Sequence, residues 1–389
     1  MPGRAAVLGG GILGLSTAVH LLRGGAEVLL LTEDGLGSGA SGRSLSWLNS
    51  GGDYGEDYYR LRMAGIDRYR TLAARNPSAD WLGFGGGLFW EDDPYAVVER
   101  HNRQTRMGYD ARLLDREDTA AQVPGLAAGV LPHRALFNPG EGWVSLPHLL
   151  RLLAAEFAAR GGTLVEHAGR CSVLAGGTSP SGGPAAADEP AHAGGPAARG
   201  VRTARGEEHA ADAVVVACGA GTADVLAEAG IALPDASDTA MLVLSEPLEH
   251  GLASVLNTPR LSVRPHPGGR LAMDHTWYLD RIHPLPDGTW DVPAAVLEEI
   301  AAEASRLLDG GPAVQIESWH PGLKPVPGDG EPVLGELREM PGCWAVFTHS
   351  GATLGLIAGE LVANEILTGR PHPFLDPFRP ERFAYGWDS

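Results

Sequence analysis

The sequence predicts an α/β fold with two structural domains. Strand and helix patterns alternate at both ends of the 389-residue chain, which is the order expected of a sheet with helical crossovers. A chain of this length is too long for one ordinary hydrophobic core. The apolar fraction of 44% and the charged fraction of 20% are those of a folded globular protein.

A strand–helix–strand unit opens the chain. Ala5–Leu8 is a short apolar strand, and Ile12–Arg23 follows with apolar residues at helical spacing until Gly24–Gly25 ends the helix. Glu27–Thr32 is a second apolar run, of the kind that is buried in a parallel sheet. These residues therefore predict one βαβ unit.

The remaining elements follow from the same patterns. The predicted helices are Tyr58–Arg75, Leu146–Arg160, Val296–Leu308 and Leu354–Leu367, and the predicted strands are Thr163–Glu166, Val201–Thr203 and Ala213–Cys218. Residues Gly176–Gly200 are rich in Gly, Ala, Pro and Ser without an apolar period, which predicts a long flexible loop. Residues 222–320 hold more isolated strands and turns.

Composition narrows the class of protein. The net charge of −18 opposes binding to phosphate backbones, so we expect no nucleic-acid partner. The three cysteines, Cys171, Cys218 and Cys343, are far apart, which argues against disulfides and zinc and fits a reducing compartment. The histidines show no metal-site grouping, so we expect no metal. Without a signal peptide or a long apolar span, we expect a cytoplasmic protein with no integral membrane segment.

A glycine-rich turn lies between the first strand and the first helix. Gly9, Gly11 and Gly14 fit the pattern G-x-G-x-x-G. They permit a tight turn, a close approach of backbone to a pyrophosphate, and close helix–sheet packing. The phosphates would lie at the helix start, Ile12 and Leu13, where N–H groups and the helix dipole favour anions.

Glu33 ends the second strand 19 residues after Gly14 and would accept hydrogen bonds from a ribose 2′-hydroxyl. Its charge argues against a 2′-phosphate. A glycine turn without a ligand remains an alternative, and the turn by itself does not distinguish NAD from FAD.

Several motifs outside this turn resemble one family. They are Gly39-Ala40-Ser41-Gly42-Arg43-Ser44, Pro139-Gly140-Glu141-Gly142-Trp143-Val144, Ala211–Gly219, Gly322-Leu323-Lys324-Pro325, Asp329–Gly335 and His349–Gly355. Together with the glycine turn, in this order, they resemble the FAD-dependent D-amino-acid oxidase superfamily. The resemblance is greatest to its glycine/sarcosine oxidase and D-amino-acid dehydrogenase-like branch.

The resemblance implies a Rossmann-type FAD-binding domain with an inserted α+β substrate domain that carries an antiparallel sheet. The FAD-binding domain would comprise residues 1–75, 145–221 and 321–389. The substrate domain would comprise residues 76–144 and 222–320, and residues 176–200 are expected to form a flexible loop.

The resemblance also implies the residues that hold FAD. The loop Ser41, Gly42, Arg43 and Ser44 would contact the pyrophosphate and the ring edge, and Cys171 lies where the backbone meets adenine. Gly219 and Gly322 belong to two further matching motifs. Gly351, Ala352, Thr353 and Leu354 would place a helix start near flavin N1–C2=O, where reduced flavin is negative. A plain glycine turn before a helix remains the alternative for this last motif.

Lys324 is the single lysine of the chain, among 30 lysine and arginine residues. The resemblance implies an arginine at this position, which clamps the substrate carboxylate. Lysine is a compact ammonium rather than a planar fork, so this departure puts a free α-amino acid in doubt. Lys324 would hold a carboxylate less rigidly, serve a different substrate, or lie near the flavin as a charge. Neutral drift from arginine is the alternative.

The predictions for flavin attachment and for substrate contacts depend on fewer residues than the prediction of FAD binding. Relatives that tether FAD use a cysteine or a histidine, and here the histidine position is Ser46, so we expect dissociable FAD. Trp47 and Asn49 follow the predicted flavin loop and would line the ring, although core packing explains them equally well. Strand alternation places His275 and Trp277 on one face, which would cover the flavin or be an ordinary half-buried strand.

These features predict an FAD-dependent amine or amino-acid oxidase or dehydrogenase. It would oxidise a C–N bond to an imine by hydride transfer to flavin N5, in a bacterial specialised pathway, with oxygen or another compound as electron acceptor. Lys324 is the candidate catalytic residue, through its charge in the oxygen step. The alternative is an FAD-dependent 2-hydroxy-acid dehydrogenase or oxidase, which would need a base for the hydroxyl proton.

Overall fold

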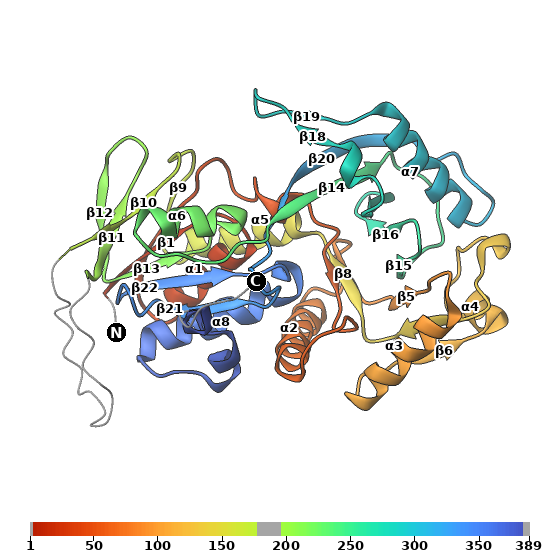
Figure 1. The fold of residues 1–389 in the computed structure, drawn as a ribbon, viewed down its shortest axis with the longest axis horizontal. Coiled ribbons are helices and arrows are strands. Elements are labelled where there is room, and N and C mark those ends of the chain that lie inside the picture. Colours follow the sequence, from red (N-terminus) through yellow and green to blue (C-terminus); the bar gives the residue numbers. More distant parts are fainter. Residues whose placement is uncertain (1–2, 177–195, 384–389) are drawn as a thin grey trace. The chain divides into compact units, whose positions relative to one another are not determined.

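The computed structural model describes residues 3–176 and 196–383 (Figure 1). Internal contacts divide the chain into two units, each assembled from separate stretches. The first comprises Met1–Gly42, Leu150–Asp238 and Leu323–Ser389, and the second comprises Arg43–Leu149 and Thr239–Gly322. These units are defined by contacts alone. The division into an FAD-binding domain and a substrate domain is defined by what each part binds, and it stays a prediction.

A six-stranded sheet in the order β21-β22-β13-β1-β2-β9 forms the centre of the first unit (Figure 1). The bounds are β1 Arg4–Leu8, β2 Glu27–Leu31, β9 Thr163–Val165, β13 Ala213–Val216, β21 Val333–Glu336 and β22 Cys343–Phe347. Adjacent strands from β22 to β9 are parallel, and β21 pairs antiparallel with β22 at one edge. The α/β class predicted from the alternating patterns is confirmed.

Side chains of β1 point alternately to the two faces of this sheet, and each face packs against different elements. Val7 faces helix α1 (Ile12–Arg23), where its Cγ1 atom lies 3.4 Å from the position a Cβ would take on Gly14. Ala6 and Leu8 belong to a buried cluster on the opposite face. That cluster includes residues of β10 (Ser172–Ala175), β11 (Ala198–Arg202) and α6 (Thr222–Glu228). The three-stranded sheet β10-β11-β12, with β12 at Glu208–Ala210, is antiparallel.

An eight-stranded sheet in the order β20-β14-β17-β16-β15-β5-β7-β6 forms most of the second unit. The bounds are β5 Gly87–Phe89, β6 Arg112–Leu114, β7 Ala135–Asn138, β14 Asp238–Ser245, β15 Val255–Asn257, β16 Ser262–His266, β17 Arg270–Asp274 and β20 Ile316–Lys324. The pair β15–β5 is parallel, whereas β14–β17, β17–β16, β16–β15, β5–β7 and β7–β6 are antiparallel. A small antiparallel sheet, β3 (Trp47–Leu48), β8 (Gly142–Val144) and β4 (Leu82–Gly83), belongs to the same unit.

Helix α7 (Ala294–Leu307) covers one face of the eight-stranded sheet. Its apolar residues Val296, Ile300 and Ala304 share a buried cluster with Val263 of β16 and Met273 of β17. The other helices of this unit are α2 (Glu56–Arg75), α3 (Pro94–Arg106) and α4 (Arg116–Gln122), and α5 (Leu146–Ala159) runs across the boundary between the two contact-defined units.

Most predicted elements lie within two residues of the observed bounds, and α1 matches its prediction at both ends. Helix α8 (Gly351–Thr368) begins three residues before the predicted Leu354, because the glycines at its start continue the helix rather than forming a separate turn. Strand β11 begins at Ala198, inside the predicted loop 176–200, and residues 177–195 of that loop lie outside the described residues. Helices α3 and α4 were not predicted.

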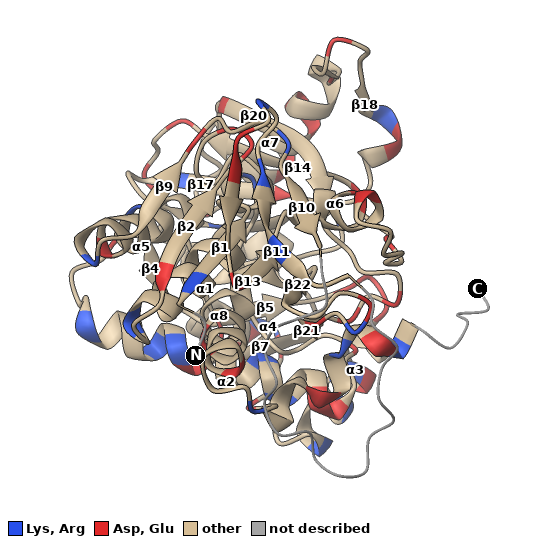
Figure 2. Ribbon diagram, turned by 90° about the vertical axis from the view of Figure 1, so that its left-hand side faces the viewer, with Lys and Arg blue, Asp and Glu red and all other residues tan. Residues whose placement is uncertain are grey.

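Figure 2 shows acidic and basic residues interspersed over the helices and loops, while β13 and β22 carry no charged residue. Within residues 3–176 and 196–383, no helix combines the length and the apolar character that crossing a bilayer requires. The same residues hold no group of three or more His, Cys, Asp or Glu side chains arranged to bind a metal ion.

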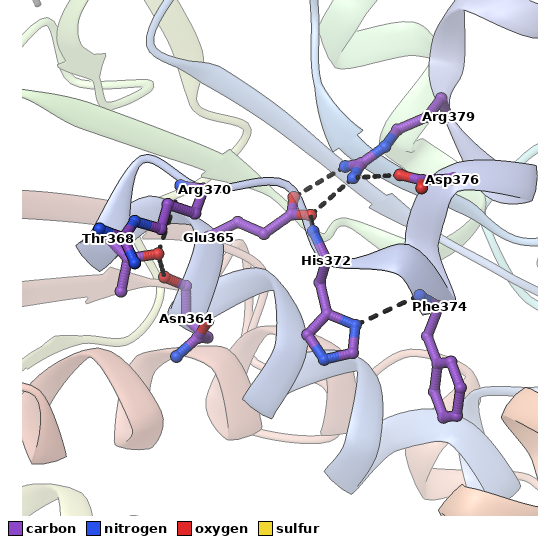
Figure 3. A network of polar contacts seen from close by, with 8 residues as sticks. All are labelled: Asn364, Glu365, Thr368, Arg370, His372, Phe374, Asp376 and Arg379. Carbon is purple, nitrogen blue, oxygen red and sulfur yellow. Dashed lines mark hydrogen bonds and ion pairs between the residues drawn. The ribbon is translucent and has the colours of Figure 1, made fainter.

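A buried ion pair fastens the C-terminal residues to α8 (Figure 3). Glu365 of α8 is 2% exposed, and both of its carboxylate oxygens accept hydrogen bonds from Arg379, at 2.7 and 2.6 Å. Its Oε1 atom also accepts the backbone N–H of His372, and Asp376 accepts from Arg379 at 3.1 Å. The segment after α8 is therefore held through one carboxylate.

We expect Glu365→Gln to lower the free energy of unfolding by about 2 kcal/mol. The amide keeps an acceptor for His372, but Arg379, whose side chain is 21% exposed, loses its buried charged partner and keeps only the exposed Asp376. Urea unfolding followed by circular dichroism measures the change. Glu56→Gln, which breaks an exposed i,i+4 ion pair with Arg60, is the matched control and should cost under about 0.5 kcal/mol. Equal losses in the two variants would contradict the proposed role.

Candidate functional site

The predicted glycine turn leads directly from β1 into α1. Gly9 has φ +111°, a conformation that glycine adopts readily and other residues rarely do. A Cβ on Gly14 would lie 2.0 Å from the carbonyl oxygen of Gly9. Gly11 is the N-cap and contributes no side-chain cap, and no acidic residue lies in the first turn of α1. The start of α1 therefore has the shape and the charge that suit a phosphate group.

The predicted flavin loop begins beside this turn. The hydroxyl of Ser41 accepts the backbone N–H of Ile12 at 3.0 Å, and the N–H of Gly37 donates to Gly10 O at 3.0 Å. Gly42 packs against the same stretch, since a Cβ there would lie 2.3 Å from Gly37 O. The structure thus brings the predicted residues at Gly9–Gly14 and at Ser41–Gly42 together within the first unit.

Glu33 and Cys171 also lie close to each other. The N–H of Gly169 donates to the carbonyl of Glu33 at 3.1 Å, which brings the strand end and the loop before Cys171 together. Burial, assisted by the charge of Glu33, raises the pKa of Cys171 to about 11. Burial and the nearby Cys171 and Glu33 raise the pKa of Cys218 to about 12, so Gly219, the next residue, lies in the same neighbourhood.

The C-terminal motif joins the glycine turn through helix packing. Helix α8 begins at Gly351, again without a side-chain cap and without an acidic residue in its first turn. Gly351 lies against Ile12, whose Cγ2 atom is 3.6 Å from the position of an added Cβ, and at Gly355 the corresponding distance to Cγ1 is 2.3 Å. Two helix starts, at Ile12 and at Gly351–Leu354, are therefore adjacent in the first unit.

Arg43 and Gly322 meet in the second unit. An added Cβ on Gly322 would lie 2.5 Å from Nε of Arg43, and Nη1 of Arg43 donates to Pro321 O at 3.5 Å. Nε itself is buried and has no hydrogen-bond acceptor among the described residues. A buried donor without an acceptor fits a group bound next to it. Ser44 accepts the N–H of Ser46 at 3.0 Å, and Ser46 has φ +57°.

Trp47 and Asn49 occupy neighbouring positions on and after β3. The carbonyl and the Oδ1 atom of Asn49 accept from Arg62 at 3.0 and 2.9 Å, and its Nδ2 atom donates to Trp47 O at 3.2 Å. The Asn49 side chain therefore makes structural hydrogen bonds, to Arg62 and to the backbone of Trp47. The Trp47 ring is half-buried and packs against the cluster of Leu45 and Leu242.

His275 and Trp277 are not on a strand, and the predicted alternation is wrong. Strand β17 ends at Asp274, and the chain turns where the N–H of His275 donates to the hydroxyl of Tyr278 at 3.0 Å. His275 Nε2 lies 3.3 Å from Thr258 O, and the indole of Trp277 donates to Arg260 O at 2.9 Å. The two residues are close together, but these contacts hold them to residues 258–260.

Lys324 is the last residue of β20 and is half-buried. Its side chain forms no ion pair or hydrogen bond with any residue of the described part of the chain. Its neighbour Leu323 is 49% exposed. No contact with the described residues therefore explains why a lysine occupies this position.

Sequence reasoning missed three buried charged residues of the second unit, Arg62, Glu141 and Arg264. Glu141 is fully buried, and its Oε1 atom accepts from the hydroxyl of Tyr109 at 2.7 Å. It lies inside the quoted motif Pro139–Val144, so a signal was present in the sequence. Arg264 is 1% exposed and lies on a strand that no local motif marks.

Comparison with known proteins gives a consistent result. The family model described as "FAD dependent oxidoreductase" matches residues 4–365. The chain is 25% identical to a glycine oxidase of Geobacillus kaustophilus over 92% of this chain and 91% of that protein. It is 27% identical to a glycine oxidase of Pseudomonas putida over 98% and 99% of the two chains.

Solved structures share the fold. The glycine oxidase from Geobacillus kaustophilus superposes with a TM-score of 0.78 at 22% identity, covering 98% of this chain and 99% of that one. An iminodiacetate oxidase from Chelativorans sp. BNC1 superposes with a TM-score of 0.76 at 21% identity, covering 97% and 99%.

Proposed function

The chain belongs to the family of FAD-dependent oxidoreductases, and on this premise we propose that it oxidises a C–N bond of an amine or amino-acid-like substrate to an imine. The relatives named above as oxidases of glycine and iminodiacetate support this choice, because both compounds carry nitrogen next to a carboxymethyl carbon. When bound, FAD supplies the two-electron acceptor for a hydride from the carbon next to nitrogen.

One observation carries the cofactor assignment: the starts of α1 and α8 lie side by side, and neither first turn contains an acidic residue. The turn at Gly9–Gly14 would hold the pyrophosphate and Glu33 the ribose, with the backbone of Cys171 beside the adenine. The start of α8 would place its positive dipole end where negative charge develops on reduction.

Non-covalent attachment of FAD is part of the proposal. Burial raises the pKa values of Cys171 to about 11 and of Cys343 to about 12, so these thiols stay protonated and are poor nucleophiles. Ser46 stands where a tethering histidine would be needed. Acid precipitation should release all flavin into the supernatant, and flavin that remained with the protein pellet would overturn this part of the proposal.

The decisive experiment is the visible spectrum of the anaerobic protein before and after addition of D-amino acids, N-methyl amino acids, cyclic amines and 2-hydroxy acids. Bleaching of the flavin bands by an amine supports C–N oxidation and identifies the substrate class. Bleaching by hydroxy acids alone would move the assignment to alcohol oxidation, and a protein that binds no flavin after reconstitution with FAD would refute the proposal.

The role proposed for Lys324 is to promote the reaction of the reduced protein with oxygen. Its ammonium has no partner among the described residues, so its charge is available to stabilise negative charge that develops on oxygen. We expect Lys324→Met to slow reoxidation by oxygen about 100-fold, while Lys324→Arg keeps most of the rate. Stopped-flow mixing of the reduced protein with oxygen measures this rate. An unchanged rate in Lys324→Met would rule out the role.

A further inference from the structure

Arg264 lies on β16 with its side chain on the face of the eight-stranded sheet opposite to α7. Its neighbour Val263 points into the buried cluster beneath α7, so the alternation of the strand directs Arg264 the other way. There it pairs in register with Ala272 of β17. The residue is 1% exposed and is the largest of the fully buried side chains.

The guanidinium is only partly satisfied by its own chain. Nε donates to the carbonyl of Leu45, and Nη1 donates to Pro265 O at 2.7 Å and to Nδ1 of His266 at 3.2 Å. The group lies over the ring of Trp143, 4.9 Å from its centroid. Nη2 makes no hydrogen bond to any residue the structure describes, and it is not among the fully enclosed polar atoms. Nη2 is therefore the donor left for a ligand.

No carboxylate of the described residues forms an ion pair with Arg264. Two partly buried arginines of the chain do pair with carboxylates: Arg379 pairs with Glu365, and Arg382 pairs with Asp329 at 2.6 Å. Burial lowers the pKa of Arg264 to about 9, opposed by the charge of Asp274. A buried cation without a counter-ion is unfavourable, and a bound anion would offset this cost.

His266 does not supply the missing negative charge. Its Nδ1 atom accepts from the guanidinium, which can only donate, so the ring carries its proton on Nε2. Burial, with the charges of Arg264, His148 and Arg270, lowers the pKa of His266 to about 3, and Glu317 opposes this only weakly. The imidazole is therefore neutral near pH 7.

Apolar side chains surround the guanidinium. Leu45, Leu242 and Ala272 form a small buried cluster on this face of the sheet, and Trp47 and Leu244 pack against it while remaining partly exposed. A single charged donor between apolar walls is the usual arrangement for orienting a small anionic ligand.

We propose that Nη2 of Arg264 binds the carboxylate of the substrate and so determines specificity for amines that carry an anionic group. The inference rests on the proposed C–N oxidation. It assigns to Arg264 the carboxylate-binding role that sequence analysis considered for the position of Lys324. Trp47 would then form an apolar wall next to the bound carboxylate.

Benzoate and benzamide test the proposal, because they share a shape and differ in charge. Isothermal titration calorimetry of the FAD-loaded protein should show benzoate binding at least tenfold more tightly than benzamide. Arg264→Gln should weaken benzoate binding by about 30-fold and leave benzamide binding within about threefold. Equal affinities for the two compounds in the unsubstituted protein would overturn the proposal without recourse to any variant.

Two further variants separate the competing roles. If Arg264 only supports Leu45, Arg264→Gln should weaken both ligands equally, and that result would refute the proposal. Lys324→Met should keep the preference for benzoate over benzamide. If Lys324→Met lost this preference while Arg264→Gln kept it, Lys324 rather than Arg264 would bind the carboxylate. Arg264→Lys keeps the charge and should recover part of the preference. Flavin bleaching by amines, measured separately, shows whether the proposed function itself holds.

Discussion

Gly14→Ala is expected to yield a protein that folds but does not retain FAD, with affinity for FAD reduced by at least about 100-fold. The added methyl group would lie 2.0 Å from the carbonyl oxygen of Gly9. That oxygen cannot retreat easily, because the N–H of Gly9 is bonded to Leu31 O at 2.9 Å and its φ of +111° is already specialised. The helix start must therefore move away from the phosphate position.

Fluorescence titration of the apoprotein with FAD measures this effect, and far-UV circular dichroism separates loss of binding from loss of fold. Gly129→Ala is the control, because Gly129 lies in the exposed 3-10 helix Ala128–Val130 and an added Cβ there meets nothing within 4 Å. This variant should bind FAD normally. A Gly14→Ala protein that binds FAD as tightly as Gly129→Ala would show that the turn at Gly9–Gly14 does not hold the cofactor.

Local rules explain which parts of the fold could be predicted. Helix α1 was located at both ends, because apolar spacing, a glycine N-cap and a glycine stop all lie within the segment itself. The turn at Gly9–Gly14 was recognised for the same reason, since its glycines are required by the tight turn and the close backbone approach within the same six residues. These features depend on residues close in sequence, which a single sequence displays directly.

Features set by distant residues could not be predicted. The alternation at His275–Tyr278 suggested a strand, but the hydroxyl of Tyr278 also donates to Met241 O at 3.1 Å, and this contact across the fold stabilises a turn. Arg264 gives no local signal, because only the packing of Leu45 and Trp143 against β16 shows that its charge is buried. Charge burial is a tertiary property, so Arg264 was not a predicted site residue, and Glu141 was noted only as a member of the motif Pro139–Val144.

Glu141 is expected to make the stability of the protein fall as the pH rises. Burial raises the pKa of Glu141 to about 7 from its ordinary 4.5, against the opposing effects of the Tyr109 hydroxyl and of Arg100. In this range the folded protein keeps a proton that the unfolded chain has released, so the free energy of unfolding decreases between pH 4.5 and 7 and reaches its lower level above pH 7. The full difference is about 3 kcal/mol.

Glu141→Gln removes this titration while its amide oxygen can still accept from Tyr109 at the position of Oε1. Urea unfolding at about pH 5 and about pH 8 should therefore show the variant gaining about 2 to 3 kcal/mol relative to the unsubstituted protein at the higher pH. Glu298→Gln, which removes an exposed carboxylate of α7, should follow the unsubstituted protein at both pH values. If Glu141→Gln did so as well, Glu141 would be ionised throughout this range, and the charges of Arg62 and Arg100 would outweigh its burial.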